Sequence, residues 1–297
     1  MDIETGERAA AALHERCVPS VVGIGRRPGR GTGVVVDPGV VVTNAHNLRG
    51  ATTTVRFADG REATGTVAGV DGDGDLAAIT VDTGGARPID WIDGAPDPAV
   101  GQVVFGLGAL PEGGARLTVG TVSATGQAFR GPGGRLIPAA IEHTAPAAPG
   151  SSGGPVVDRE GRLVGLNTHR LGDGFYLAVP ATDDLHRRLR DLARGQSPTR
   201  PRLGVALVPP AAARRLREAV GPPAREGLLL AGVDAGGPAG RAGLQRGDLL
   251  VAADGRDLRD VDDLAAALEA GGAEVRLRYL RHLGEHEAVV LLGGEGA

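Results

Sequence analysis

The sequence predicts a mainly β fold followed by a small mixed α/β domain. Short segments rich in Val, Ile and Thr recur between residues 18 and 181 at the spacing of about 8–12 residues typical of β-barrels and sandwiches. Glycine supplies 50 of 297 residues, against a usual share of about 7%, so turns are frequent. Aromatic residues make up only 2%, so the core is aliphatic.

The first part of the chain predicts one helix and then strands. Residues 3–16 are rich in alanine and predict a short helix. From Val18 onward the segments become β-branched and alternate with Gly, Pro and Asp, which are strand and turn signals. The strands expected here are 21–24, 33–36, 40–43, 52–57, 61–70, 76–81, 102–106, 118–123, 137–144, 155–157 and 163–167.

A helix and a linker end this part. Thr182 or Asp183 can cap a helix in which Leu185, Leu189 and Leu192 recur at helical spacing. The helix ends near residue 195, and 196–201 is a linker by composition. No helical period interrupts the strands before it, which argues against a parallel βαβ fold.

The last part predicts a separate module. Strands over 203–208, 227–233 and 248–252, helices over 211–220 and 261–270, and a hairpin of 275–280 with 288–292 form a mixed α/β unit. We therefore divide the chain into an N-terminal helical segment (1–17), a β domain (18–195), a linker (196–201) and an α/β domain (202–293).

Composition excludes several classes of function. The net charge is −4, the arginines are scattered and no lysine occurs, so nucleic-acid binding, a phosphate-binding loop with lysine and lysine nucleophiles are not expected. The single cysteine, Cys17, excludes an intrachain disulfide. No signal peptide or membrane-spanning run is seen, so we expect a cytoplasmic protein, or one of the cell envelope if Met1 is not the native start.

The segment 148–155 carries the most informative chemistry. Ser152 stands among small residues, where an uncrowded hydroxyl and free backbone N–H groups suit acyl transfer. Taken alone, the segment 148–155 is typical of a flexible Gly/Ser loop. It also fits the G-x-S-x-G nucleophile elbow, but a strand and a turn follow it instead of a helix, so we reject the elbow.

A base and a carboxylate precede this serine. His46 ends a valine-rich strand, and Asp75 leads into an apolar strand, where a carboxylate needs a partner such as an imidazole N–H. His46 would accept the proton of Ser152, Asp75 would orient the imidazole, and the backbone amides of Gly150 and Ser152 would bind the oxyanion. The order His, Asp, Ser is that of chymotrypsin-type proteases.

The alternating aspartates up to Asp75 have a competing interpretation as a calcium-binding loop. Asp71, Asp73 and Asp75 alternate, but Leu76 and Asp82 stand where such a loop needs Gly and Glu. We therefore expect no metal or cofactor, and we interpret Asp71 and Asp73 as solvated turn residues.

Three motifs together resemble the HtrA-type (Deg) serine proteases. These are 42–46 (VTNAH), 74–77 (GDLA) and 150–155 (GSSGGP), and 237–244 and 247–250 are similar to the PDZ domain that such proteases carry. The resemblance implies a chymotrypsin-like double β-barrel followed by a PDZ domain, and a serine endopeptidase that cleaves unfolded or misfolded proteins.

The resemblance also implies roles for individual residues. It makes His46 the general base, Asp75 the orienting acid and Ser152 the nucleophile. The implied oxyanion hole comprises Gly150, Ser151 and Ser152, the substrate pocket is bordered by Leu166, Asn167, Thr168 and His169, and protein C-termini bind the PDZ domain beside Leu203, Gly204 and Val205. Leu264 and Leu268 line that groove or simply pack in the core.

Some residues depart from the family pattern. Ser151 stands where Asn is usual, Asn47 replaces Val, and Ala145 replaces Asp. Family trimers use N-terminal contacts, often aromatic, so a homotrimer is implied, although residues 1–19 contain no aromatic side chain. The alternatives are a catalytically silent PDZ scaffold or chaperone, and an esterase that uses the same triad.

Overall fold

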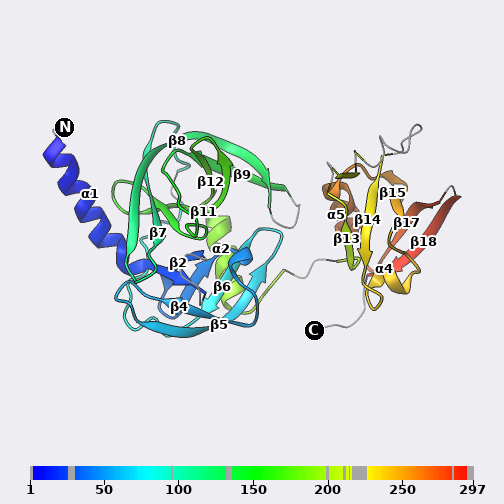
Figure 1. Ribbon diagram of the computed structural model, residues 1–297, viewed down its shortest axis with the longest axis horizontal. Coiled ribbons are helices and arrows are strands. Elements are labelled where there is room, and N and C mark those ends of the chain that lie inside the picture. The colour runs from blue at the N-terminus through cyan, green and yellow to red at the C-terminus, as the bar shows by residue number, and fades with distance from the viewer. Residues whose placement is uncertain are drawn as a thin grey trace. The chain divides into compact units, whose positions relative to one another are not determined.

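The computed structural model describes residues 3–25, 31–94, 96–131, 136–198, 201–209, 212, 213, 215, 226–282 and 284–292. The chain divides into two compact units, Met1–Pro198 and Thr199–Ala297. Figure 1 shows the helices and strands of both units.

The first unit begins with a helix and a closed six-stranded barrel. Helix α1 (Ile3–Cys17) leads through η1 (Val18–Ser20) into β1 (Val21–Ile24). The barrel order is β1-β2-β3-β6-β5-β4. Its other strands are β2 (Gly31–Asp37), β3 (Val40–Thr43), β4 (Thr52–Arg56), β5 (Glu62–Asp71) and β6 (Leu76–Thr80). Every neighbouring pair is antiparallel, as short strands joined by turns require.

A second closed barrel follows, with the order β10-β11-β12-β9-β8-β7. Its strands are β7 (Val103–Ala109), β8 (Ala115–Arg130), β9 (Leu136–His143), β10 (Pro155–Val157), β11 (Leu163–Gly172) and β12 (Phe175–Pro180). The strands predicted from the sequence are shorter than β8 and β11, and no strand is predicted at β12. Register shifts interrupt these strands, so the regular alternation on which a sequence prediction depends is broken there.

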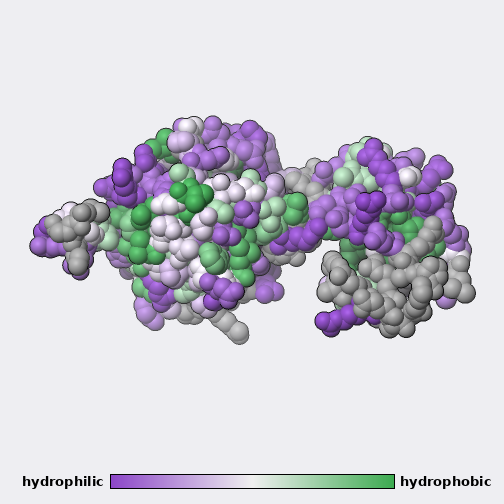
Figure 2. Space-filling model, turned by 90° about the horizontal axis from the view of Figure 1, so that it is seen from above, coloured by the Kyte–Doolittle hydropathy of each residue, from purple (hydrophilic) through white to green (hydrophobic). Residues whose placement is uncertain are grey.

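Helix α2 (Asp183–Ala193) closes the first unit. The Thr182 side chain accepts a hydrogen bond from the Leu185 N–H and caps it, as predicted. The three leucines at helical spacing are buried in a cluster that also contains Leu76 of the first barrel and Leu166 of the second. This aliphatic cluster holds both barrels and α2 together through apolar burial. Some large apolar side chains of this unit remain on the surface, among them Val100 and Val119, and Val119 lies opposite Phe105 where β7 pairs with β8. Figure 2 shows apolar side chains of this unit in separate groups.

The described residues of the second unit form a sheet and two helices. Its strand order is β13-β14-β15-β17-β18, with β16 beside β15. The elements are β13 (Val205–Leu207), β14 (Leu228–Val233), α4 (Pro238–Arg241), β15 (Leu249–Ala253), β16 (Arg256–Asp257), α5 (Val261–Ala270), β17 (Glu274–Arg281) and β18 (Gly284–Leu291). Most of the helix expected over 211–220 lies outside the described residues.

Candidate active site

His46 and Asp75 meet at the ends of neighbouring strands. His46 lies in η2 (Ala45–Asn47), directly after β3, and Asp75 directly precedes β6. Because β3 and β6 pair in antiparallel register, the end of one lies beside the start of the other. The Asn44 side chain and the Ala45 N–H donate to the Asp75 carbonyl over 2.9 and 3.2 Å and fix this junction.

The Asp75 carboxylate is buried and accepts hydrogen bonds from three donor groups. Its side chain is 2% exposed, and its Oδ2 lies 2.8 Å from Nδ1 of His46. It also accepts from the backbone N–H of His46 over 3.1 Å and from the hydroxyl of Thr168 over 3.1 Å. A buried carboxylate needs such donors, and these hold the imidazole with its Nδ1–H toward Asp75 and Nε2 free for chemistry.

Ser152 is connected to Asp75 and His46 by hydrogen bonds through Thr168 and Asn47. Its hydroxyl donates to the Thr168 carbonyl over 3.4 Å, and the Thr168 hydroxyl binds Asp75. Its carbonyl accepts from the Asn47 side chain over 2.9 Å, and Asn47 is the residue after His46. Thr168 and Asn47 thus bring the predicted serine, histidine and aspartate to one place.

The loop before Ser152 is shaped by glycine and by Thr32. Gly150 has φ +88°, in the left-handed region, and its carbonyl accepts from the Thr32 hydroxyl over 2.7 Å. At Gly153, with φ +85°, a Cβ would lie 2.2 Å from the Thr32 carbonyl, so only glycine fits. These contacts hold the loop against β2.

The oxyanion-hole prediction needs one revision. The Ser151 N–H donates to the Ala148 carbonyl over 3.0 Å and closes a turn, so it is not available to an oxyanion. Among the described residues, no hydrogen bond is found for the N–H groups of Gly150 and Ser152. Two amides, rather than three, therefore remain for this role.

The side chains of the four residues predicted for the substrate pocket lie in different environments. The Leu166 side chain is fully buried in the aliphatic core, and the Thr168 hydroxyl faces Asp75. His169 is exposed and stacks on Phe129 with ring centroids 5.7 Å apart. Asn167 does line a small pocket, together with Ser151. Alternating side-chain directions along β11 explain why four consecutive residues cannot share one surface.

Asp71 is not the solvated turn residue that the sequence suggests. Its side chain is 4% exposed and accepts from Arg188 over 2.6 Å and from the Gly74 N–H over 3.0 Å. Arg188 lies 117 positions away in the sequence, so no local signal could reveal the pair. Within the described residues no group of three His, Cys, Asp or Glu side chains could hold a metal ion.

The residues predicted for peptide binding belong to the edge strand and to the apolar core of the second unit. Gly204 has φ +73°, and β13, which follows it, is an edge strand of the sheet. Leu203, Leu264 and Leu268 are buried in one apolar cluster, and Val205 packs on it. The two leucines of α5 are therefore mainly core residues.

Known proteins match both units. A trypsin-like peptidase domain matches residues 31–166, and a PDZ domain matches residues 230–281. The putative serine protease HhoA of Synechocystis sp. is 31% identical over 85% of this chain and 67% of its own length. A probable periplasmic serine endoprotease, DegP-like, of Halomonas elongata is 30% identical, and the chain spans 56% of its length.

A solved structure supports the same fold. The HtrA-type protease AlgW with decapeptide has a TM-score of 0.60 and 23% identity, over 97% of this chain and 99% of that one. No helix among the described residues is long and apolar enough to cross a membrane.

Proposed function

Because the chain belongs to the HtrA-type serine proteases, serine endopeptidases that carry a PDZ domain, we propose that it cleaves unfolded or misfolded polypeptides with His46, Asp75 and Ser152 as its triad. The observation that carries the proposal is the buried Asp75 carboxylate on His46 Nδ1, joined to Ser152 through Thr168. A buried carboxylate that orients an imidazole beside a serine is the arrangement that activates a hydroxyl nucleophile.

In the proposed reaction, Nε2 of His46 removes the proton of Ser152 Oγ as the oxygen attacks the scissile carbonyl. For this step the hydroxyl turns from the Thr168 carbonyl toward the imidazole, a rotation about one side-chain bond. Asp75 stabilises the imidazolium that forms, and the N–H groups of Gly150 and Ser152 stabilise the oxyanion. The imidazolium then protonates the leaving amine, and water releases the acyl group by the same steps in reverse.

The PDZ domain is proposed to bind protein C-termini. Among the described residues β13 pairs with β14 alone, so its other edge offers backbone groups to an added strand, and the positive φ of Gly204 turns the backbone before it. We propose the limits 18–195 for the catalytic domain and 202–293 for the PDZ domain. The division of the chain after Pro198 falls within the linker 196–201 and supports them.

Assembly and compartment remain predictions. The homotrimer implied by the resemblance is checked by sedimentation equilibrium of the full chain. The cytoplasmic location expected from the sequence competes with the cell envelope, since the relative from Halomonas elongata is named periplasmic. Cell fractionation of the source organism distinguishes the two.

The test compares wild type with Ser152→Ala on casein or another unfolded protein. Loss of a triad serine lowers kcat by about 10⁶-fold, so cleavage should disappear, and a fluorophosphonate probe should label wild type only. Equal cleavage by both proteins would remove Ser152 from the mechanism. Absence of cleavage and labelling in wild type would support the silent scaffold, and ester turnover without proteolysis would support the esterase.

A further inference from the structure

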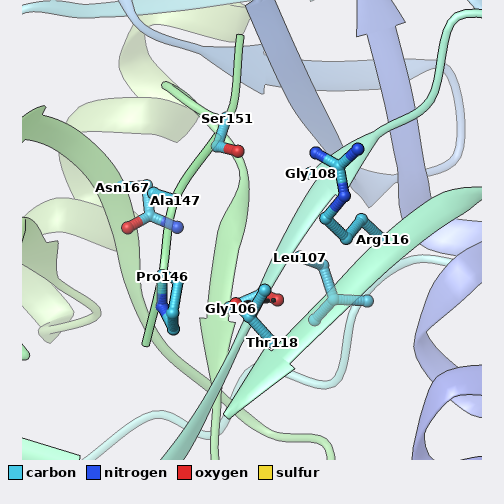
Figure 3. A pocket seen from close by; sticks show the side chains of 9 residues that line it. All are labelled: Gly106, Leu107, Gly108, Arg116, Thr118, Pro146, Ala147, Ser151 and Asn167. Atoms are coloured by element: carbon cyan, nitrogen blue, oxygen red, sulfur yellow. Dashed lines mark hydrogen bonds between the residues drawn. The ribbon is translucent and has the colours of Figure 1, made fainter. Parts of the chain in front are cut away.

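A small pocket lies beneath the loop that carries the proposed nucleophile. It is bounded by β7, by β8 and by the chain segment before Ser152 (Figure 3). His46, Asp75 and Ser152 are not among its lining residues. The lining residues are Gly106, Leu107, Gly108, Arg116, Thr118, Pro146, Ala147, Ser151 and Asn167. The pocket is therefore separate from the triad but shares a wall with the oxyanion loop.

Three hydrogen-bond donors meet in this pocket. They belong to the side chains of Arg116, Ser151 and Asn167, and Figure 3 shows the Ser151 hydroxyl and the Arg116 guanidinium facing each other. Ser151 is 9% exposed and Asn167 is 4% exposed, so both residues are about nine-tenths buried or more, whereas Arg116 is exposed at the mouth of the pocket. Within the described part of the chain, neither the Ser151 hydroxyl, the Asn167 amide nitrogen nor the Arg116 guanidinium has a hydrogen-bond partner. None of the three donors is a fully enclosed atom, so each faces the open space of the pocket, where a bound ligand can accept its hydrogen bonds.

His143 contacts one end of the Asn167 amide and leaves the other end toward the pocket. Nε2 of His143 lies 2.9 Å from Oδ1 of Asn167, and His143 is fully buried. Because the partner of Nε2 is the amide oxygen, Nε2 carries the ring proton and donates it, and burial, which lowers the pKa of His143, favours this neutral ring. The Asn167 NH₂ group is thereby left to point into the pocket.

The chemistry of the lining selects the charge of an occupant. No Asp or Glu lines the pocket, while a guanidinium, an amide NH₂ and a hydroxyl do. The remaining hydroxyl, that of Thr118, is already used because it donates to the Gly106 carbonyl over 3.2 Å. Three donors, one of them positively charged, and no acidic side chain favour an anion as the ligand. The space is about that of a single water molecule, so the anion has to be compact.

We propose that this pocket binds a compact monovalent anion, chloride or a carboxylate group, which holds the nucleophile loop in place. Ser151 stands between Gly150 and Ser152, whose amides form the proposed oxyanion hole. An anion on the Ser151 hydroxyl and Arg116 ties this loop to β8. The binding stands on the pocket itself, whereas its effect on hydrolysis rests on the proposed function.

The binding test is the thermal unfolding of the full chain in sodium chloride, sodium formate and sodium gluconate at equal ionic strength. Gluconate is too large for the pocket. At ten times the dissociation constant, chloride or formate should raise the Tm of the first unit by about 3–6 °C over gluconate. Arg116→Gln should abolish this difference. Arg87→Gln, at an exposed arginine outside the pocket, should retain it.

The activity test uses the same salts. The kcat for a chromogenic peptide should rise in the salt that raises the Tm, in wild type and Arg87→Gln but not in Arg116→Gln. Equal Tm values in all three salts, or a shift that survives Arg116→Gln, would overturn the proposal. A response to formate alone identifies a carboxylate as the ligand, and one to chloride alone identifies a free halide. A Tm shift in a protein that hydrolyses nothing upholds the anion site and refutes the proposed function.

Discussion

Arg188 on α2 donates a hydrogen bond over 2.6 Å to the buried carboxylate of Asp71, which ends β5. The same carboxylate accepts from the Gly74 N–H, one residue before Asp75. Asp75 itself has φ +53°, in the left-handed region that costs energy for most residues. The helix that follows the second barrel therefore fixes the strained turn that presents the proposed catalytic acid.

Replacing Arg188 should disturb catalysis and stability together. Arg188→Met removes one charged donor from the buried Asp71 carboxylate, which should lower the free energy of unfolding by about 1–3 kcal/mol, a range that allows for the partial exposure of Arg188. The kcat should fall while KM changes little, because the change acts on Asp75. Arg187→Met on the same helix removes only an exposed pair with Asp184 and should alter stability by less than about 0.5 kcal/mol. Chemical denaturation and steady-state kinetics measure both effects, and equal losses in the two variants would contradict this role.

Thr168→Val should slow the chemical step. The substitution removes the hydroxyl that donates to Asp75 but retains the backbone carbonyl that accepts from Ser152. A hydrogen bond to a charged group contributes about 1.5–3 kcal/mol, so we expect kcat/KM to fall by about 10- to 100-fold. Thr168→Ser keeps the hydroxyl and should restore most of the activity. If valine and serine reduce kcat/KM equally, the lost methyl packing, not the hydrogen bond, explains the change.

The sequence indicates the parts of this site that depend on nearby residues. His46, Asp75 and Ser152 each lie at the end of a strand or in a glycine-rich loop, so their motifs are visible in short segments. Thr32, Thr168 and Arg188 act across the fold, through hydrogen bonds to residues about 90–120 positions away. Their residue types are common and no local pattern marks them, so only the closed barrels reveal their partners.

Protonation of His143 should contribute to the pH dependence of the stability of the first unit. Burial lowers the pKa of His143 in the folded state below its ordinary value of 6.5. The unfolded chain then binds more protons below pH 6.5, so stability falls as the pH decreases from there, by up to about 1.4 kcal/mol per pH unit. His143→Gln can still donate to Asn167 but cannot titrate, so its stability should change less between pH 6.5 and 5.

Urea unfolding of the first unit at several pH values measures this difference. His282→Asn, at an exposed position of the second unit, is the matched control and should follow wild type. A wild-type slope that persists in His143→Gln would assign the pH dependence to other groups.

The second unit should depend on the Asp248 carboxylate. Its side chain is 2% exposed and receives two hydrogen bonds of 2.8 Å from Arg281 and one from the Gln245 N–H. Burial alone would raise the pKa of Asp248, but these donors outweigh it and lower the pKa below 3.8. The stability they supply is present above the unfolded pKa and is lost as the pH falls through the lower folded value.

Asp248→Asn should therefore destabilise the second unit by about 1–3 kcal/mol at pH 7, and the difference from wild type should shrink below pH 3.8. Asp257→Asn is the control, because Asp257 is 74% exposed and its nearest Arg278 nitrogen lies 3.9 Å away. Cleavage of a short peptide should be unchanged in both variants, since the proposed triad belongs to the first unit. A loss of stability that is the same at pH 3 and pH 7 would show that packing around Asp248, and not its charge, holds the second unit together.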